Sequence, residues 1–154
     1  MKNLILLLLF IPLVSFGQIS ISDLIKVGKM DMESFEIYAL EKGYRFEDLQ
    51  NRDSEKGLIM KKSNGSRTEF LTLYLNPSIV NVKYKGPVQE RLVSIYKELK
   101  SLAFKIDRTF ELNDEKIYVK EYSRSGPQNS WRDLLEIKIY SDGIYCEIHY
   151  LKFL

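Results

Sequence analysis

Residues 87–104 read PVQERLVSIYKELKSLAF and predict an amphipathic helix. The apolar residues recur at the period of an α-helix and form one stripe, whereas polar and charged residues fill the other side. The residues of this stripe are Val88, Leu92, Ile95, Tyr96, Leu99, Leu102 and Ala103. Gly86-Pro87 predicts the start of this helix, because proline in the first turn loses no needed N–H and already has a helical φ.

A second helix is predicted over Met32–Lys42, near the start of the chain. Asp31 is suited to the N-cap, and Gly43 stands where a glycine commonly follows a helix. Just before it, Ser22 is placed to cap a short turn. That turn carries Leu24, Ile25 and Val27 and ends at Gly28.

The two helices and the segments that follow them predict an internal duplication. At an offset of 60 residues, apolar positions of the first helix and its next strands match those around the second helix. The matched pairs include Met32 and Leu92, Phe35 and Ile95, Ala39 and Leu99, Tyr44 and Phe104, and Phe46 and Ile106. After a longer loop in the second copy the offset becomes 66, which pairs Leu71 with Ile137 and Tyr84 with Tyr150. Repeat 1 is predicted at about 22–86 and repeat 2 at about 87–154, sharing one core.

Each repeat is expected to contain four strands. They are predicted at 44–49, 58–62, 68–75 and 79–85, and at 105–111, 116–122, 133–140 and 144–152. Asn64-Gly65 and Asp142-Gly143 are strong hairpin signals between strand-like segments. Asn76-Pro77-Ser78 and Asn113-Asp114-Glu115 occupy similar places, and Ser123–Ser130 is the longest predicted loop. Consecutive hairpins make a sheet antiparallel. We therefore expect an α+β fold of order α-ββββ-α-ββββ, with two helices packed on one face of an antiparallel sheet.

The first seventeen residues have the layout of a secretory signal peptide. A short basic start precedes an apolar segment, Leu4–Val14, and Ser15-Phe16-Gly17 supplies small residues before Gln18. The apolar segment is about half of the roughly 20 residues that a membrane-spanning helix needs. Residues 1–17 are thus predicted to be cleaved. The remainder, 18–154, is expected to be a single domain without a membrane span, located in the periplasm or secreted.

Charge and cysteine content exclude several classes of function. The chain has 23 basic and 21 acidic side chains, a formal net charge of +2, which gives no reason to expect a nucleic-acid partner. The single cysteine, Cys146, excludes an intramolecular disulfide. The core must therefore stabilise the fold without covalent cross-links.

No catalytic, metal or cofactor site is predicted. His149 is the only histidine, and Cys146 lies three residues before it. Residues three apart on a strand point to opposite faces, so these two side chains should not converge. Two such ligands are also fewer than a structural zinc site requires. We expect a non-enzymatic protein, although a hydrolase using a carboxylate pair stays open because such chemistry needs no histidine.

Tyrosines provide the remaining functional signal. The chain has ten, and several alternate out of phase with the aliphatic core positions. The candidate binding residues on the sheet face away from the helices are Tyr74, Tyr118, Tyr122, Tyr140 and Tyr145. Tyrosine is favoured at interfaces, although it is also a good strand former. The expected partner is an envelope or secreted protein.

The helical face is expected to be less suited to binding. The charged residues Glu90, Arg91, Lys97, Glu98 and Lys100 should cover it with solvated side chains. The alternative function is a carrier of a small apolar ligand between helices and sheet. That carrier would need a cavity among Phe35, Leu92, Leu99 and Ile137.

The layout of Ser22–Leu154 resembles that of exported binding domains. Duplicated helix-plus-sheet modules with an uncovered binding face resemble the β-lactamase inhibitor protein family and the PepSY-type envelope domains. No sequence motif of either family is present, and the two-cysteine hairpins of the inhibitor are missing. The resemblance implies a non-enzymatic binding role and transfers no functional residue.

Overall fold

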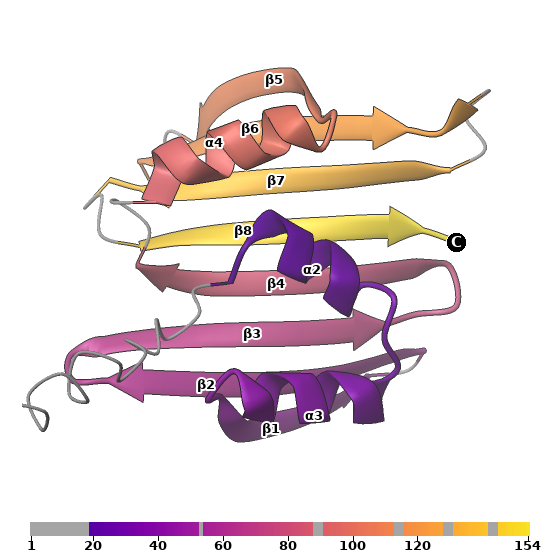
Figure 1. The fold of residues 1–154 in the computed structure, drawn as a ribbon, viewed down its shortest axis with the longest axis vertical. Helices are drawn as coiled ribbons and strands as arrows, with labels where there is room; N and C mark the ends of the chain where they lie inside the picture. Colours follow the sequence, from indigo (N-terminus) through magenta and orange to yellow (C-terminus); the bar gives the residue numbers. More distant parts are fainter. Residues whose placement is uncertain (1–18, 53, 88–90, 113–115, 128–130, 142–144) are drawn as a thin grey trace, which may run out of the picture.

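An eight-stranded antiparallel sheet forms the body of the protein (Figure 1). The computed structural model describes residues 19–52, 54–87, 91–112, 116–127, 131–141 and 145–154. The strands lie side by side in the order β1-β2-β3-β4-β8-β7-β6-β5. Strands β4 and β8 pair at the centre, which leaves β1 and β5 at the two edges. The α+β class and the antiparallel sheet are confirmed. The signal-peptide residues 1–17 and the turns at 113–115 and 142–143 lie outside the described residues.

All eight predicted strands overlap observed ones. The observed strands are β1 (Arg45–Arg52), β2 (Glu55–Asn64), β3 (Arg67–Leu75), β4 (Ile79–Pro87), β5 (Lys105–Leu112), β6 (Ile117–Ser125), β7 (Arg132–Tyr140) and β8 (Tyr145–Phe153). Strand β6 continues through the first three residues of the predicted 123–130 loop, because these residues pair with the start of β7. In the β2–β3 hairpin, Asn64 is the last strand residue, and Gly65 has the positive φ of +60°.

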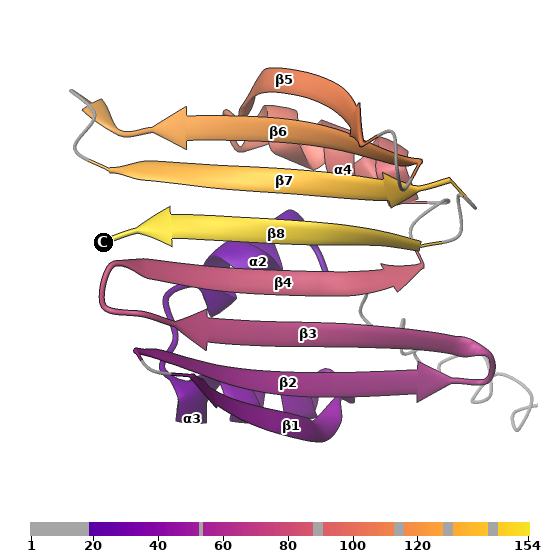
Figure 2. The same cartoon turned by 180° about the vertical axis from the view of Figure 1, so that it is seen from behind.

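Three helices, rather than the two expected, occur in the described part of the chain. They are α2 (Ile21–Val27), α3 (Met32–Glu41) and α4 (Leu92–Ser101). All three lie on the same side of the sheet, and the other side shows only strands (Figures 1 and 2). None of these helices combines the length and apolarity needed to cross a membrane.

The short helix α2 begins two residues earlier than predicted. Its N-cap is Ser20, not Ser22, and a capping box joins Ser20 to Asp23. The Ser20 hydroxyl accepts from the Asp23 N–H, while the Asp23 carboxylate accepts from the Ser20 N–H. Ser22 lies inside the helix. Ser22 lies closer to the apolar residues of the turn than Ser20 does, which makes Ser22 resemble the cap in the sequence alone.

Helix α3 matches its prediction closely. Asp31 is the N-cap and accepts from the Ser34 N–H at 2.8 Å. Gly43 follows the helix with a φ of +83°. This conformation lets the Tyr44 N–H donate back to the Ala39 carbonyl. It is the left-handed helix ending that glycine adopts without strain.

Helix α4 is shorter at both ends than predicted. Pro87 is the last residue of β4 and pairs with Tyr145, so it does not start the helix. The first helical turn has no side-chain cap, and α4 begins at Leu92; residues 88–90 lie outside the described residues. At the other end Ala103 has a φ of +61° and is exposed, so it ends the helix rather than extending its apolar stripe. The centre of the stripe, Ile95 and Leu99, is buried as predicted.

One contiguous core lies between the sheet and the three helices. It contains apolar residues from α2, α3 and α4 and from strands of both halves of the sheet. Phe35, Leu73, Leu99 and Ile137 are each at most 2% exposed. The two halves of the sheet therefore share a core through the β4–β8 pairing.

Both edge strands carry a β-bulge. The pairing register shifts between Phe46 and Asp48 in β1, and between Ile106 and Arg108 in β5. A bulge bends its strand and redirects the side chains around it. The bulge of β1 places Glu47 and Asp48 beside the sheet face that has no described helix.

Candidate functional site

The side of the sheet without described helices is called the open face below (Figure 2). Its residues follow from the strand register, because directly paired residues share a face and side chains alternate along a strand. One row across the sheet runs Ile59, Thr72, Lys83, His149, Glu136. The next row runs Lys61, Phe70, Lys85, Glu147, Lys138. Tyr74, Tyr140 and Tyr145 belong to the same face by alternation.

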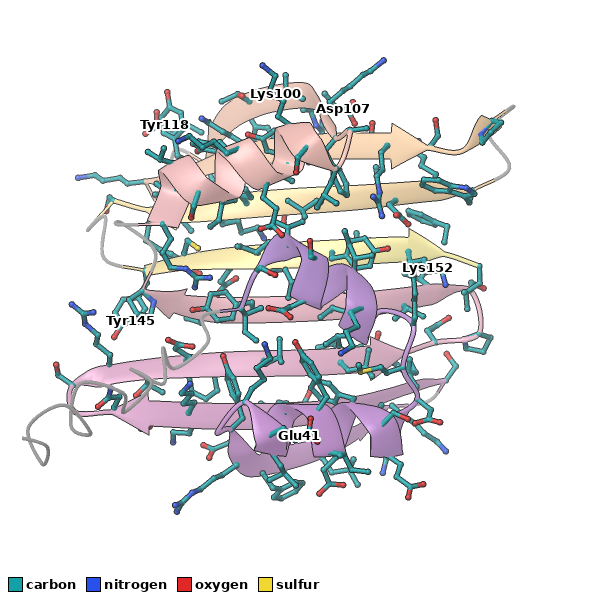
Figure 3. The ribbon with its side chains drawn as sticks, in the orientation of Figure 1. Glu41, Lys100, Asp107, Tyr118, Tyr145 and Lys152 are labelled. Carbon is teal, nitrogen blue, oxygen red and sulfur yellow. The ribbon has the colours of Figure 1, made fainter. Side chains whose placement is uncertain are left out.

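Three of the five predicted tyrosines lie on the open face. Tyr74 packs against β2, where Gly57 is its paired residue. A Cβ at Gly57 would lie 2.4 Å from the Tyr74 ring, so the glycine makes room for it. Tyr140 donates its hydroxyl to Glu147 at 2.7 Å. Tyr145 is the first residue of β8 and is half-buried (Figure 3).

The other two predicted tyrosines lie on the helix-covered side. Tyr122 is 8% exposed and belongs to the core, and burial together with neighbouring Tyr96 of α4 raises its pKa to about 12. Lys120 lies between Tyr118 and Tyr122 on β6, and its ammonium is 4.5 Å from the centre of the Tyr96 ring. Tyr118 shares this side by alternation and is 51% exposed (labelled in Figure 3). The prediction of an open-face position was therefore wrong for both.

The error at β6 has a physical cause. Ile117 and Val119 are of the residue types common in a core, and placing them on the helix-covered side would put Tyr118 and Tyr122 on the opposite one. In the structure Val119 is fully buried on the open face, between Phe110 of β5 and Lys138 of β7. The strand is thus apolar on both faces, and its alternation does not determine which face meets the helices.

Ion pairs cover much of the open face. The Lys85 ammonium lies 3.1 Å from Glu147, and the Lys138 ammonium lies 3.1 Å from Glu136. His149 lies between the two carboxylates, 3.3 Å from Glu147 and 3.7 Å from Glu136. Further ion pairs join Lys61 to Glu47 and Arg108 to Glu121. Most charges on this face are therefore already matched by a neighbour.

Glu147 is the most strongly engaged group of this network. Hydrogen bonding from His149, and then from Tyr140 and Lys85, lowers the pKa of its carboxyl against the opposing effect of burial. The group is therefore held ionised. A general acid of a hydrolase needs the reverse, a raised pKa.

A pocket of about 510 Å³ opens on this face over strands β1, β2, β3, β4 and β8. Its lining comprises Glu47, Asp48, Ile59, Phe70, Thr72, Lys83, Tyr84, Lys85, Glu147 and His149. The volume falls in the range of small-molecule sites, about 300–1,000 Å³. None of the five predicted tyrosines lines it. The pocket could not be predicted from the sequence. Its shape depends on the β1 bulge and on the pairing of β4 with β8, and local sequence patterns show neither feature.

Cys146 and His149 point to opposite faces, in agreement with the strand argument. Cys146 is buried on the helix-covered side, and burial raises the pKa of its thiol to about 12. His149 is engaged with carboxylates on the open face and is less exposed than expected, with 17% of its side chain accessible. Within the described ranges, no group of three or more His, Cys, Asp or Glu side chains is arranged to hold a metal ion.

The helical face differs from its prediction at two positions. Arg91 is 9% exposed, donates to the Tyr84 hydroxyl at 3.3 Å and also donates to the Ile19 carbonyl. The Glu98 carboxylate accepts from the backbone N–H groups of Ile21 and Ser22, the first residues of α2. These two charges join α4 to the start of the described chain. They are not a solvated cover.

Lys97 and Lys100 are exposed as expected, whereas Glu90 lies outside the described residues. The residues proposed for an apolar cavity between helices and sheet, Phe35, Leu99 and Ile137, are packed in the core, with Leu92 partly buried against it. The 510 Å³ pocket lies on the opposite side of the sheet.

No protein-family model, curated protein or solved structure matches the chain.

Proposed function

We propose that this protein is an exported, non-enzymatic binding domain whose open face contacts another envelope or secreted protein. The observation that carries the proposal is a broad sheet face without a described helix, on which tyrosines stand among paired charges. The proposed anchors are Tyr74, Tyr140 and Tyr145. The resemblance in layout to the β-lactamase inhibitor protein family and PepSY-type domains belongs to this proposal and supplies no residue.

The contacts of these tyrosines support an interface role. Tyr140 is held by its hydrogen bond to Glu147, and Tyr74 is held against Gly57. A side chain that is already fixed loses little conformational entropy when a partner binds. The ion pairs around them also reduce the number of unpaired charges that an interface would have to bury.

Alanine substitution tests the proposal with a matched control inside the chain. Tyr140→Ala and Tyr145→Ala should each weaken a partner by about thirtyfold, because a central aromatic anchor is worth roughly 2 kcal/mol. Tyr118→Ala removes an exposed tyrosine from the other side of the same sheet and should leave affinity unchanged. Partners would be captured from native envelope and secreted fractions, and affinities then measured with the purified partner.

Equal capture of all partners by wild type and by folded Tyr140→Ala and Tyr145→Ala variants would overturn the proposal. Loss of capture on Tyr118→Ala alone would move the interface to the helix-covered side.

The rival functions differ in what they require. A carrier of an apolar ligand requires a cavity among side chains that instead form the packed core. A hydrolase that uses carboxylates requires an acid with a raised pKa, whereas Glu147, one of the three carboxylates that line the pocket, has a lowered one. Both requirements favour binding by the open face.

Export is the second part of the proposal. We infer that residues 1–17 are a signal peptide and that the mature protein begins at Gln18, in the periplasm or outside the cell. The buried core of the described residues starts at Ile19, which is 2% exposed and accepts from Arg91. Intact-mass measurement of the exported protein should show Gln18 as the first residue. A protein that retains Met1 in the membrane fraction would contradict it.

The third part concerns the internal duplication of repeats 22–86 and 87–154. Several local features recur at the predicted offset of 60 residues. Gly43 and Ala103 both have positive φ after a helix, and Tyr44 and Phe104 make the same return hydrogen bond. The bulges in β1 and β5 fall at equivalent places, 46/48 and 106/108. These shared irregularities support the duplication, because regular helices and strands alone would not require them.

A further inference from the structure

Within the part of the chain that the structure describes, the lining of the 510 Å³ open-face pocket includes one lysine without a carboxylate partner. Lys85 pairs with Glu147, and Glu47 pairs with Lys61. Among the described residues, Lys83 forms no ion pair. Its ammonium lies 4.8 Å from the centre of the Tyr74 ring, a contact that holds the charge in place without neutralising it.

Among the described residues, Asp48 is the pocket carboxylate that forms no ion pair, and it stands on a different strand from Lys83. The row that links them passes from β1 through Ile59 and Thr72 to β4. Three steps between neighbouring strands put the backbones of β1 and β4 about 14 Å apart. Asp48 instead accepts from the Leu49 N–H at 2.9 Å and from Gln50 at 3.3 Å.

An apolar floor lies beside this cation. Ile59 on β2 and Phe70 on β3 line the pocket, and Thr72 between them and Lys83 is 6% exposed. The site thus offers a positive charge at one wall and an apolar surface next to it. A ligand that fits has the opposite arrangement, an anionic group attached to an apolar body.

We propose that this pocket binds an organic carboxylate carried on an apolar group, with Lys83 as its counter-ion and Ile59 and Phe70 as its apolar support. A volume of 510 Å³ admits a bicyclic aromatic acid or a terminal residue of a peptide. The inference goes beyond the protein-binding function proposed above and does not depend on it.

Two probes of equal shape isolate the charge. The purified protein is titrated by calorimetry and by amide chemical shifts with 2-naphthoate and with its neutral analogue 2-naphthamide. Naphthoate should bind about tenfold more tightly, since a charge-assisted contact adds about 1.4 kcal/mol. The shifts should centre on β3 and β4, and the preference should fall as salt is added.

Variants of the open face identify the residue responsible. Lys83→Met should abolish the preference for naphthoate over naphthamide, and Lys83→Arg should keep it. The matched control is Lys138→Met, because Lys138 lies on the same face but pairs with Glu136 and does not line the pocket. That variant should retain the preference. Melting curves confirm that each variant is folded.

A second arm separates the two sources of such a carboxylate. A short peptide that ends in a free phenylalanine carboxylate is compared with the same peptide amidated at its C-terminus. Tighter binding of the free-acid peptide than of naphthoate identifies a protein terminus as the ligand; tighter binding of naphthoate identifies a small metabolite-like acid. Both results support the carboxylate site.

The proposal is overturned by equal affinity for naphthoate and naphthamide, or by absence of binding up to about 5 mM. A loss of preference in Lys138→Met equal to that in Lys83→Met would also overturn it. All of these readouts use small probes and the isolated protein. Failure here is therefore distinguishable from failure to find a protein partner.

Discussion

Glu147 is the residue of the open face whose carboxylate contacts several polar side chains at once. Lys85, Tyr140 and His149 all contact its carboxylate, and they lower its pKa from the usual value of 4.5. A carboxyl whose pKa is lowered on folding stabilises the protein fully above its unfolded pKa. That contribution is lost as the pH falls through the lower, folded pKa.

Glu147→Gln should therefore flatten the dependence of stability on acidic pH. Urea unfolding at pH 7 and pH 3 should show a smaller difference in unfolding free energy for the variant than for wild type. Glu36→Gln, an exposed substitution on α3, serves as the control and should preserve the wild-type difference. An unchanged difference in Glu147→Gln would mean that the network contributes nothing to folding.

Individual residues also show where prediction from sequence succeeds. Tyr74, Tyr140 and Tyr145 were placed on the correct face because the strands that hold them alternate clearly. Tyr118 and Tyr122 were not, because both faces of β6 are apolar. The sequence does not identify Lys83 as a candidate binding residue. Its interest comes from having no carboxylate partner among the described residues, and its neighbours on β3 and β8 are set by pairing between strands, the β8 residue being distant in sequence.

At the scale of elements, the ends of the two longer helices differ in one informative residue. Gly43 after α3 and Ala103 after α4 both adopt positive φ, of +83° and +61°. An alanine in this region is strained by its Cβ, and a glycine is not.

Ala103→Gly should stabilise the protein by about 1 kcal/mol, and Gly43→Ala should destabilise it by a similar amount or more. Chemical denaturation of the two variants measures both effects. Opposite signs are the essential result, because the same pair of residues is exchanged in the same backbone conformation. Destabilisation by both changes would show that packing, not backbone strain, decides these positions.

The apolar stripe of α4 gives a second test at this scale. Leu99 is 2% exposed, so Leu99→Ala should cost roughly 2–5 kcal/mol through lost burial and a residual cavity. Lys97→Ala, on the exposed side of the same helix, should change stability by less than about 0.5 kcal/mol. A melting temperature unmoved by Leu99→Ala would mean that α4 does not pack on the sheet as described.

Helix boundaries were harder to predict than helix existence. The pattern 87–104 predicts α4 and its buried side. Pro87, however, belongs to β4, where it pairs with Tyr145 of β8. Local sequence does not show this pairing because the two residues lie almost sixty positions apart. Likewise Ser20 caps α2 through Asp23, while Glu98 from α4 accepts the N–H groups of the first turn. Local signals specify which segments are helical. The pairing of Pro87 with β8 keeps that residue out of α4, whereas the local signals Asp31 and Gly43 mark the two ends of α3.

At the scale of the whole molecule, the shared core predicts that the two halves of the sheet unfold together. Leu73 lies in the first half and Leu135 in the second, and both belong to one contiguous cluster. The single tryptophan, Trp131, precedes β7 and reports on the second half.

Leu73→Ala should therefore shift the unfolding transition seen by Trp131 fluorescence as much as the transition seen by circular dichroism. Coincident curves are expected of a two-state unit. A tryptophan transition that stays at the wild-type position while the circular dichroism curve splits would show that the halves are independent. The measurement requires no substitution in the second half.

The bulges at the two edges of the sheet have a consequence for how the protein behaves at high concentration. A straight edge strand presents unpaired N–H and C=O groups to which a ninth strand from another copy can add, and repetition of that step makes a fibre. Here the ladder is interrupted near Asp48 at one edge and near Arg108 at the other, each beside charged side chains. An incoming strand would have to follow the bend and bury those charges. Addition of a strand from another copy is thereby disfavoured at both edges of the sheet.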